Sequence, residues 1–310
     1  MSTPLVSIII PCYNAQAWVA ESIRSAVDQS WVNTEVIVVD DGSKDSSLSI
    51  ARTFESPKVK VITQQNRGAS AARNAGLALA QGSEIQFLDA DDVLHRHKIR
   101  KQIEVRQTCD PLALLSGEWD RFEQSTSEAL FQTKPNWRNM SGVEFLQLFY
   151  ETFAMMQPAA WLSPRLLIDR CGPWNESLTL NDDGEYFARV MLASPGIVYC
   201  EGARVYYRSG VQGSLSRRKD RRSLESLFRS VDLMLRYLLE FDQSERTRAA
   251  AAFAWKWTAF ETYPGAADLS SECMRRSREM GGSERPFPAG RKFQLLSRFL
   301  GWHLAKRIAL

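Results

Sequence analysis

Three carboxylates close together in the sequence are the residues most able to do chemistry. Asp89, Asp91 and Asp92 directly follow a short apolar run that ends at Leu88. Carboxylates this close repel one another and cannot all be buried without compensation. A divalent cation would compensate them, because Mg²⁺ and Mn²⁺ prefer carboxylate oxygens together with phosphate oxygens. The alternative is a solvated acidic turn that caps the helix predicted to start near His95.

A second acidic pair, Asp182 and Asp183, comes before a helix predicted over 185–192. One carboxylate of the pair could be the N-cap of that helix, where the helix dipole favours negative charge. Capping explains only one of the two residues. The other is left for binding or catalysis.

The elements that must position these carboxylates alternate between strand and helix. Apolar runs at 5–10, 36–39, 59–62 and 83–89 predict strands covered on both faces, with helical spacing between them. This alternation predicts a parallel sheet with right-handed crossovers, an α/β fold. Ligands bind such sheets outside the carboxyl ends of the strands. Polar residues stand at all four ends, namely Tyr13-Asn14, Asp40-Asp41, Asn66-Arg67 and Asp89 to Asp92.

The first two strand ends suit a nucleotide base and its ribose. The ring of Tyr13 can stack on a flat base, in a loop held by Pro11. Asp41, with Asp40 beside it, can accept hydrogen bonds from a uracil-like imide or a ribose hydroxyl. The alternative for the second strand end is an ordinary turn that is capped by Ser43.

The third strand end suits phosphate. Arg67 and Arg73 stand at the start of a helix predicted over 70–80. The N–H groups and the dipole of a helix N-terminus favour anions. Gly68 would let a phosphate or a sugar approach the backbone closely, so this turn and helix predict a diphosphate site.

In this order, the motifs PCYN, VVDDGSKD, NRGASAARNAG and LDADD resemble those of inverting glycosyltransferases of family 2. The resemblance covers about residues 4–215 and implies the GT-A fold, a mostly parallel α/β sheet flanked by helices. The implied glycosyltransferase domain covers 1–215, with a nucleotide-sugar half at about 1–115 and an acceptor half at about 116–215. A helical C-terminal region over 216–310 lies outside the resemblance.

The resemblance also implies a reaction and its cofactor. A sugar would move from a nucleotide diphosphate sugar to a hydroxyl of a glycan or lipid-linked acceptor, with inversion at the anomeric carbon and with Mg²⁺ or Mn²⁺ bound. Asp89 would hold the ribose and Asp91 the metal, with Asp92 as an alternative ligand. The implied nucleotide-sugar contacts are Pro11, Tyr13, Asn14, Asp41, Arg67, Gly68, Arg73, Asp89 and Ala90.

The family pattern assigns the general base to Asp183, ahead of Asp182, because Arg189 stands six residues beyond it as an arginine does in the family. The sequence departs from the family after Arg208, where many relatives have a histidine and this chain has none. Arg208, or Arg217 and Arg218, could neutralise the diphosphate instead.

Three other functions compete with sugar transfer. A catalytically inactive nucleotide- or glycan-binding module of the same fold would not need both acidic clusters, and this chain keeps both. A nucleotidyltransferase would have a glycine-rich, basic loop after the first strand, and PCYN does not supply one. A dehydrogenase would have a GxGxxG motif after a strand, which is missing.

The composition sets limits on class and location. Hydrophobic residues make up 44% of the 310 residues, enough for a sizeable core, and a net charge of +3 argues against nucleic-acid binding. Five cysteines without a CxxC pair suit a reducing compartment. Neither a signal peptide nor a transmembrane helix is expected. We therefore predict a cytoplasmic protein, with peripheral contact at the inner face of the membrane.

That membrane contact is predicted from the stretch 291–310. Phe293, Leu296, Leu300 and Leu304 recur at helical spacing, and the stretch carries five Lys and Arg residues and no acidic one. A helix with an apolar face, a basic face and a tryptophan is typical of the interface of an anionic membrane. A last helix packed on the helical region is the alternative.

Overall fold

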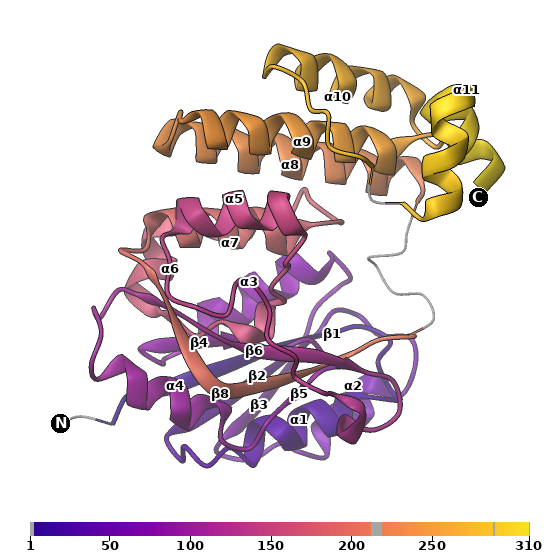
Figure 1. Ribbon diagram of the computed structural model, residues 1–310. Coiled ribbons are helices and arrows are strands. Elements are labelled where there is room, and N and C mark those ends of the chain that lie inside the picture. The colour runs from indigo at the N-terminus through magenta and orange to yellow at the C-terminus, as the bar shows by residue number, and fades with distance from the viewer. Residues whose placement is uncertain (1–2, 212–218, 288, 310) are drawn as a thin grey trace.

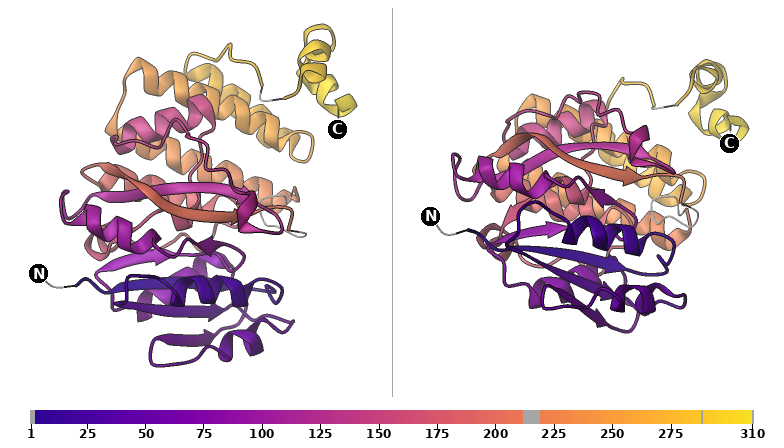
Figure 2. Two further views of the ribbon diagram at one scale, coloured as in Figure 1. Left: turned by 60° about the horizontal axis from the view of Figure 1, so that its bottom comes forward. Right: turned by 90° about the horizontal axis from the view of Figure 1, so that it is seen from below.

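The computed structural model describes residues 3–211, 219–287 and 289–309. In Figure 1 the N-terminal strands and the C-terminal helices lie at opposite ends of the molecule, and the views of Figure 2 show the same separation. The α/β architecture with a helical C-terminal region is the one predicted from the sequence.

The larger sheet has five strands in the order β3-β2-β1-β4-β7. The first four are parallel to one another, and β7 pairs antiparallel with β4. Their bounds are β1 Val6–Cys12, β2 Thr34–Asp40, β3 Val59–Thr63, β4 Glu84–Phe87 and β7 Ser163–Pro164. The four strands predicted from apolar runs are therefore confirmed, and they leave their polar ends at one edge of the sheet.

Both faces of this sheet are covered, because successive side chains of a strand point to opposite faces. Along β1, Ile9 belongs to one buried cluster, whereas Ile8 and Ile10 belong to the other. Along β2, Val39 and Val38 divide in the same way. Burying one such side chain stabilises the fold by about 1.5–3 kcal/mol. The continuous apolar runs arise from this double burial.

A second sheet has the order β5-β8-β6, with β8 parallel to β6 and antiparallel to β5. Its strands are β5 Val93–Leu94, β6 Leu114–Phe122 and β8 Ile197–Arg208. The register of β6 against β8 shifts between Ser116 and Glu118. Since β5 follows the acidic cluster directly, pairing of Val93 with Tyr206 fixes that cluster beside the end of β8.

Helices cover the two sheets in layers. The helices of the first two thirds of the chain are α1 Val19–Val27, α2 Ser47–Arg52, α3 Ala69–Leu79, α4 Lys98–Arg106, α5 Gly142–Thr152, α6 Arg165–Cys171 and α7 Asp182–Ala193. The C-terminal ones are α8 Arg221–Phe241, α9 Glu245–Thr262, α10 Ala267–Glu279 and α11 Arg291–Ala309. Figure 1 shows α8, α9 and α10 stacked beyond α5 and α7.

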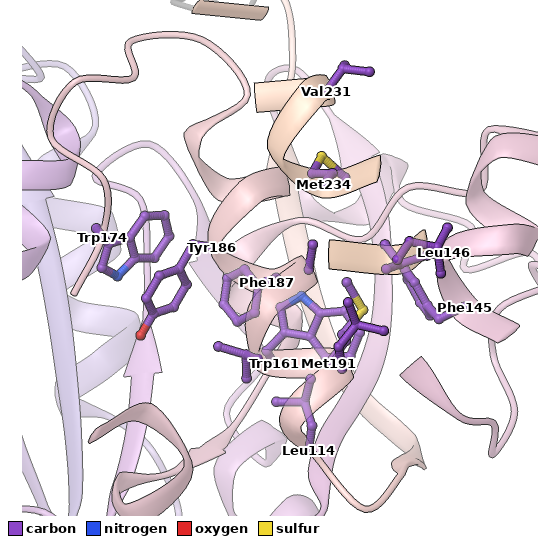
Figure 3. Packing of buried hydrophobic residues seen from close by; sticks show 14 of the residues in the cluster. Leu114, Phe145, Leu146, Trp161, Trp174, Tyr186, Phe187, Met191, Val231 and Met234 are labelled. Atoms are coloured by element: carbon purple, nitrogen blue, oxygen red, sulfur yellow. The ribbon is translucent and has the colours of Figure 1, made fainter. Parts of the chain in front are cut away.

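An aromatic cluster joins the layers (Figure 3). Trp174 stacks on Tyr186 at 4.0 Å between ring centroids, and the ring of Phe87 meets Trp174 edge-on at 5.1 Å. Val231 and Met234 of α8 belong to the same buried cluster. The helical region therefore shares its core with the α/β region, and the predicted boundary near residue 215 falls outside the described residues.

The C-terminal stretch corrects one prediction. The helical backbone of α11 is interrupted at Gly301, which has φ 72° and ψ 154°, a conformation that no helical residue adopts. The single amphipathic helix predicted over 291–310 is therefore two short helical arms joined at Gly301. Within the described residues, no helix is long and apolar enough to cross a membrane.

Candidate active site

Arg73 on α3 lies between the two acidic clusters and holds a carboxylate of each. Its Nη2 donates to Asp89 Oδ1 at 2.8 Å, and its Nη1 donates to Asp182 Oδ2 at 2.9 Å. The guanidinium is buried, with its centre 4.4 Å from the centre of the Trp174 ring. The two carboxylates raise the pKa of Arg73 despite its burial, so its charge is fixed. Residues 93 positions apart in the chain thus meet at one cation.

Ser70 and Asn74 extend this contact along the same helix. The Ser70 hydroxyl donates to Asp182 Oδ2 at 2.8 Å. The Asn74 amide donates to the Trp174 carbonyl at 3.0 Å and accepts from the Trp174 N–H at 2.8 Å. Neither residue was predicted from the sequence to belong to the site. The available signal was that Arg73 and Asn74 stand three and four residues after Ser70, because residues at i, i+3 and i+4 lie on one side of a helix.

Asp91 and Asp92 occupy different environments, which bears on the metal ligand. Asp92 is buried, its Oδ1 accepts the Arg208 N–H at 2.9 Å, and burial raises its pKa well above the ordinary value. Asp91 is partly exposed, and within the described residues it forms no ion pair. Desolvation, followed by the charge of Asp89, raises the pKa of Asp91 to about 6. Of the two, Asp91 has the carboxylate that a bound cation could reach.

The residues present fit a divalent ion that is completed by its substrate. No three His, Cys, Asp or Glu side chains of the described residues are grouped so as to hold a metal by themselves. Mg²⁺ is commonly bound by one or two carboxylates together with substrate phosphates. The Asp91 carboxylate supplies one such oxygen ligand. Burial and the neighbouring charge of Asp89 disfavour its negative charge, and a bound cation would compensate for both.

Asp182 and Asp183 both lie in the first turn of α7, and the N-cap position belongs to Asn181. Neither carboxylate is therefore the cap that the sequence left as an alternative. Asp182 is held by Arg73 and Ser70, whereas Asp183 forms no ion pair among the described residues. Burial, followed by the charge of Asp182, raises the pKa of Asp183 to about 6. A carboxylate with that pKa can accept a proton near neutral pH.

Tyr13 lies on an exposed loop that follows β1. Its side chain is 43% exposed, although it follows the buried strand β1. The loop is rigidly held, because Asn14 receives the N–H of Lys44 on its Oδ1 at 2.8 Å and donates its own N–H to Ser43 Oγ at 3.0 Å. A ring presented in this way is available for stacking on a base.

Asp41 is buried and holds the turn before α3. Its Oδ2 accepts the Gly68 N–H at 2.8 Å, and its Oδ1 accepts the Arg67 N–H at 2.9 Å and the Gln64 amide at 2.8 Å. The structure thus gives Asp41 a role in fixing the turn, and its contact with a base stays a prediction. Asp40 is also buried, and its Oδ1 has no hydrogen-bond partner among the described residues.

Gly68 has φ 94°, a conformation that glycine adopts readily, and apart from its chain neighbours no heavy atom of the described residues lies within 4 Å of where a Cβ would stand. Space beside this backbone is therefore open, but the Gly68 N–H is already donated to Asp41, and the approach of a phosphate or sugar here stays a prediction. Arg67 is exposed and pairs with Glu176 at 2.5 Å, whereas Arg73 is committed to carboxylates. Of the two predicted phosphate ligands, only Arg67 has an accessible guanidinium.

The remaining predicted residues have structural surroundings of their own. Pro11 lies in β1 opposite Val39, and the methyl group of Ala90 packs in the core, so only backbone atoms of Ala90 are left for the predicted contact. Arg189 pairs with Glu185 at 2.8 Å and donates to the Pro173 carbonyl at 2.9 Å, which fixes the turn before α7.

Arg208 was expected to neutralise diphosphate, but its guanidinium is already engaged by other groups of the protein. Its Nε donates to the Asp91 carbonyl at 2.9 Å, its Nη1 to the Glu123 carbonyl at 3.2 Å, and its Nη2 pairs with Glu21. The side chain is buried between the rings of Trp18 and Phe122. Arg208 therefore positions the loop that carries Asp89, Asp91 and Asp92, here called the acidic loop. The other two candidates, Arg217 and Arg218, lie outside the described residues.

The fold agrees with comparisons to known proteins. A family model described as Glycosyl transferase family 2 matches residues 7–168, more than half of the chain. The chain belongs to glycosyltransferase family 2. An uncharacterized glycosyltransferase of Rickettsia prowazekii is 32% identical over 181 residues, which are 58% of this chain and 57% of that protein. The chain thus covers little more than half of that relative's length.

Another relative carries a more specific name. The putative teichuronic acid biosynthesis glycosyltransferase TuaG of Bacillus subtilis is 40% identical over 104 residues, 33% of this chain and 41% of that protein. Among solved structures, TarS of S. aureus is similar with a TM-score of 0.68 and 17% identity, over 98% of this chain and 53% of that chain. A shorter form of TarS in complex with UDP has a TM-score of 0.62 and 16% identity, over 90% and 93% of the two chains. These structures establish the likeness of fold.

Proposed function

We propose that this protein transfers a sugar from a uridine diphosphate sugar to a hydroxyl of a glycan or lipid-linked acceptor, with inversion of the anomeric carbon. Membership of family 2 supports sugar transfer. TarS, which shares the fold, has been crystallised with UDP and with UDP-GlcNAc, and this supports the choice of nucleotide. The observation that carries the proposal is the pair of acidic clusters that Arg73 joins at one edge of the sheet.

The donor would lie along that edge. Tyr13 would stack on the uracil ring, because it is the exposed aromatic residue at the end of β1. The turn at Gly68 would receive the diphosphate, with the accessible Arg67 beside it. Asp91 would hold Mg²⁺ or Mn²⁺ against the diphosphate oxygens. When bound, the ion stabilises the negative charge that develops on the departing diphosphate.

Asp183 would act as the general base. Its carboxylate takes the proton of the acceptor hydroxyl as the hydroxyl oxygen forms a bond to the anomeric carbon. The bond from that carbon to the diphosphate oxygen breaks on the opposite side, and its electron pair leaves with the nucleoside diphosphate. Asp183 then releases the proton to solvent. Arg73 and Ser70 keep Asp182 in place beside the base.

A cytoplasmic location fits the thiols. All five cysteines are free, and burial raises the pKa of the Cys12, Cys200 and Cys273 thiols to about 12. Such groups are unreactive and suit a reducing compartment.

The proposal is tested by incubating the full chain with a panel of nucleotide diphosphate sugars, with and without Mg²⁺ or Mn²⁺, and measuring released nucleoside diphosphate. We expect release from a uridine diphosphate sugar that stops when the metal is chelated. Asp91→Ala should abolish it and remove the metal dependence of UDP binding by calorimetry, whereas Asp28→Ala, an exposed acidic control, should not. Metal-independent binding of UDP without release from any donor would instead identify an inactive binding module.

A further inference from the structure

The two arms of α11 leave a set of large apolar side chains in solvent. Those side chains are Leu295, Phe299, Leu300, Leu304 and Ile308, here called the α11 apolar set, and Phe299 is 80% exposed. Single exposed apolar residues are normal on a protein surface, but groups of them mark sites of interaction. Five within fourteen consecutive residues are such a group.

Other residues of α11 hold it against the rest of the protein, so the exposure of the α11 apolar set does not mean that α11 is undocked. Phe293 is buried and meets Phe260 at 5.2 Å between ring centroids, and Trp302 meets Phe287 at 4.9 Å. Lys306 is buried and donates to the Phe260 carbonyl. The tryptophan that the sequence assigned to a membrane interface therefore points into the protein. The kink at Gly301 lets both arms dock by one side and expose the other.

The charges around the α11 apolar set have one sign. Arg291, Lys292, Arg298 and Arg307 are exposed, and within the described residues none of them forms an ion pair. The sequence contains no acidic residue from Arg285 to Leu310. Four exposed cations beside exposed apolar side chains complement a surface that is both anionic and apolar beneath its charges.

We propose that α11 docks the protein on the surface of an anionic lipid membrane, with the α11 apolar set inserted at the level of the headgroups. An anionic lipid surface offers negative headgroups for the four cations and an apolar layer beneath them for the α11 apolar set. A second copy of the chain fits less well, because an isologous contact would bring two sets of four cations together. This docking does not depend on the sugar-transfer chemistry. In Figure 1, α11 lies toward the same side of the molecule as the C-terminal end of β8.

Co-sedimentation of the full chain with lipid vesicles tests the docking. We expect binding to vesicles rich in phosphatidylglycerol, weakened by salt, and little binding to phosphatidylcholine alone. Each cation near an anionic surface contributes about fivefold to binding, so Arg291→Gln/Lys292→Gln/Arg298→Gln should lower the partition coefficient about a hundredfold. Arg222→Gln/Arg229→Gln/Arg278→Gln removes the same charge from exposed arginines elsewhere and should lower it far less.

A second pair of variants isolates the apolar contribution. Phe299→Ser should lower binding about tenfold, whereas Phe241→Ser, at a 61% exposed phenylalanine of α8, should not. Circular dichroism should show all variants folded. Absence of vesicle binding, or equal losses in the α11 and control variants, would overturn the proposal. A concentration-dependent dimer in light scattering that Phe299→Ser abolishes would assign the α11 apolar set to a second copy and also overturn it.

Discussion

The substitution Asp182→Asn should shift the acid limb of the pH–rate profile to lower pH and leave the enzyme active. Desolvation and then the negative charge of Asp182 raise the pKa of Asp183 from 3.8 to about 6. A general base must be deprotonated, so the rate falls as pH falls through that pKa. Removing the neighbouring charge lowers the pKa of Asp183. Asparagine keeps the oxygen that accepts from Arg73 and Ser70, so the geometry is retained.

The order of magnitude of the shift follows from Coulomb's law. Two unit charges at an assumed separation of about 6 Å interact by roughly 0.7–2.8 kcal/mol for an effective dielectric constant of about 80 to 20. One pH unit corresponds to about 1.4 kcal/mol, so the limits are about 0.5 and 2 pH units. Arg73 cancels part of the charge of Asp182, and we expect a shift of about 1 unit. At pH 5 the rate relative to its plateau should then rise about fivefold, because the ionised fraction of a group with a pKa near 5 replaces that of one near 6.

The shift is measured as kcat/KM for nucleoside diphosphate release across acidic to neutral pH, which reports ionisations of the free enzyme. Asp28→Asn removes one exposed carboxylate elsewhere and should leave the acid limb in place. An unchanged limb in Asp182→Asn would show that the catalytic base does not sense Asp182. Loss of all activity in Asp182→Asn would mean that the base is Asp182 itself.

Two further predictions concern donor binding and stability. Tyr13→Ala should weaken UDP binding in calorimetry by about tenfold, because stacking on an aromatic ring is worth about 1–3 kcal/mol; a change in the unfolding midpoint instead of the affinity would contradict a binding role. Arg106→Met should lower the free energy of unfolding in urea by about 3–5 kcal/mol, because it leaves the buried Glu84 without the guanidinium that lies 2.8 Å from it. The double variant Arg106→Met/Glu84→Gln should recover part of that loss, and a single variant as stable as the double one would refute the pairing.

The sequence predicted the sheet because burial on both faces makes each strand a continuous apolar run. The same runs ended at the polar residues of the candidate site, so the placement of Asp41, Asp91 and Tyr13 at strand ends was also predictable. Strands and the residues that end them are set by short stretches of sequence, so a local pattern is enough to predict them.

The partners of the charged residues were not predictable in this way. Arg73 was predicted to bind phosphate, but it pairs with Asp89 and Asp182, a contact that depends on where the fold places the first turn of α7. Arg208 likewise holds the acidic loop only because β8 pairs with β5. At the C-terminus, Gly301 was a visible breaker, yet the helical spacing on both sides of it suggested one helix.

The measurement that most directly tests Asp183 as the catalytic base compares Asp183→Asn with the unaltered chain in two assays. Calorimetry measures binding of UDP with metal, and single-turnover kinetics measures sugar transfer or donor hydrolysis. We predict unchanged UDP affinity and a rate lowered by about 10²–10⁴, the usual contribution of a general base. A rate close to that of the unaltered chain, or an equal loss of affinity and rate, would contradict the assignment of Asp183 as the base.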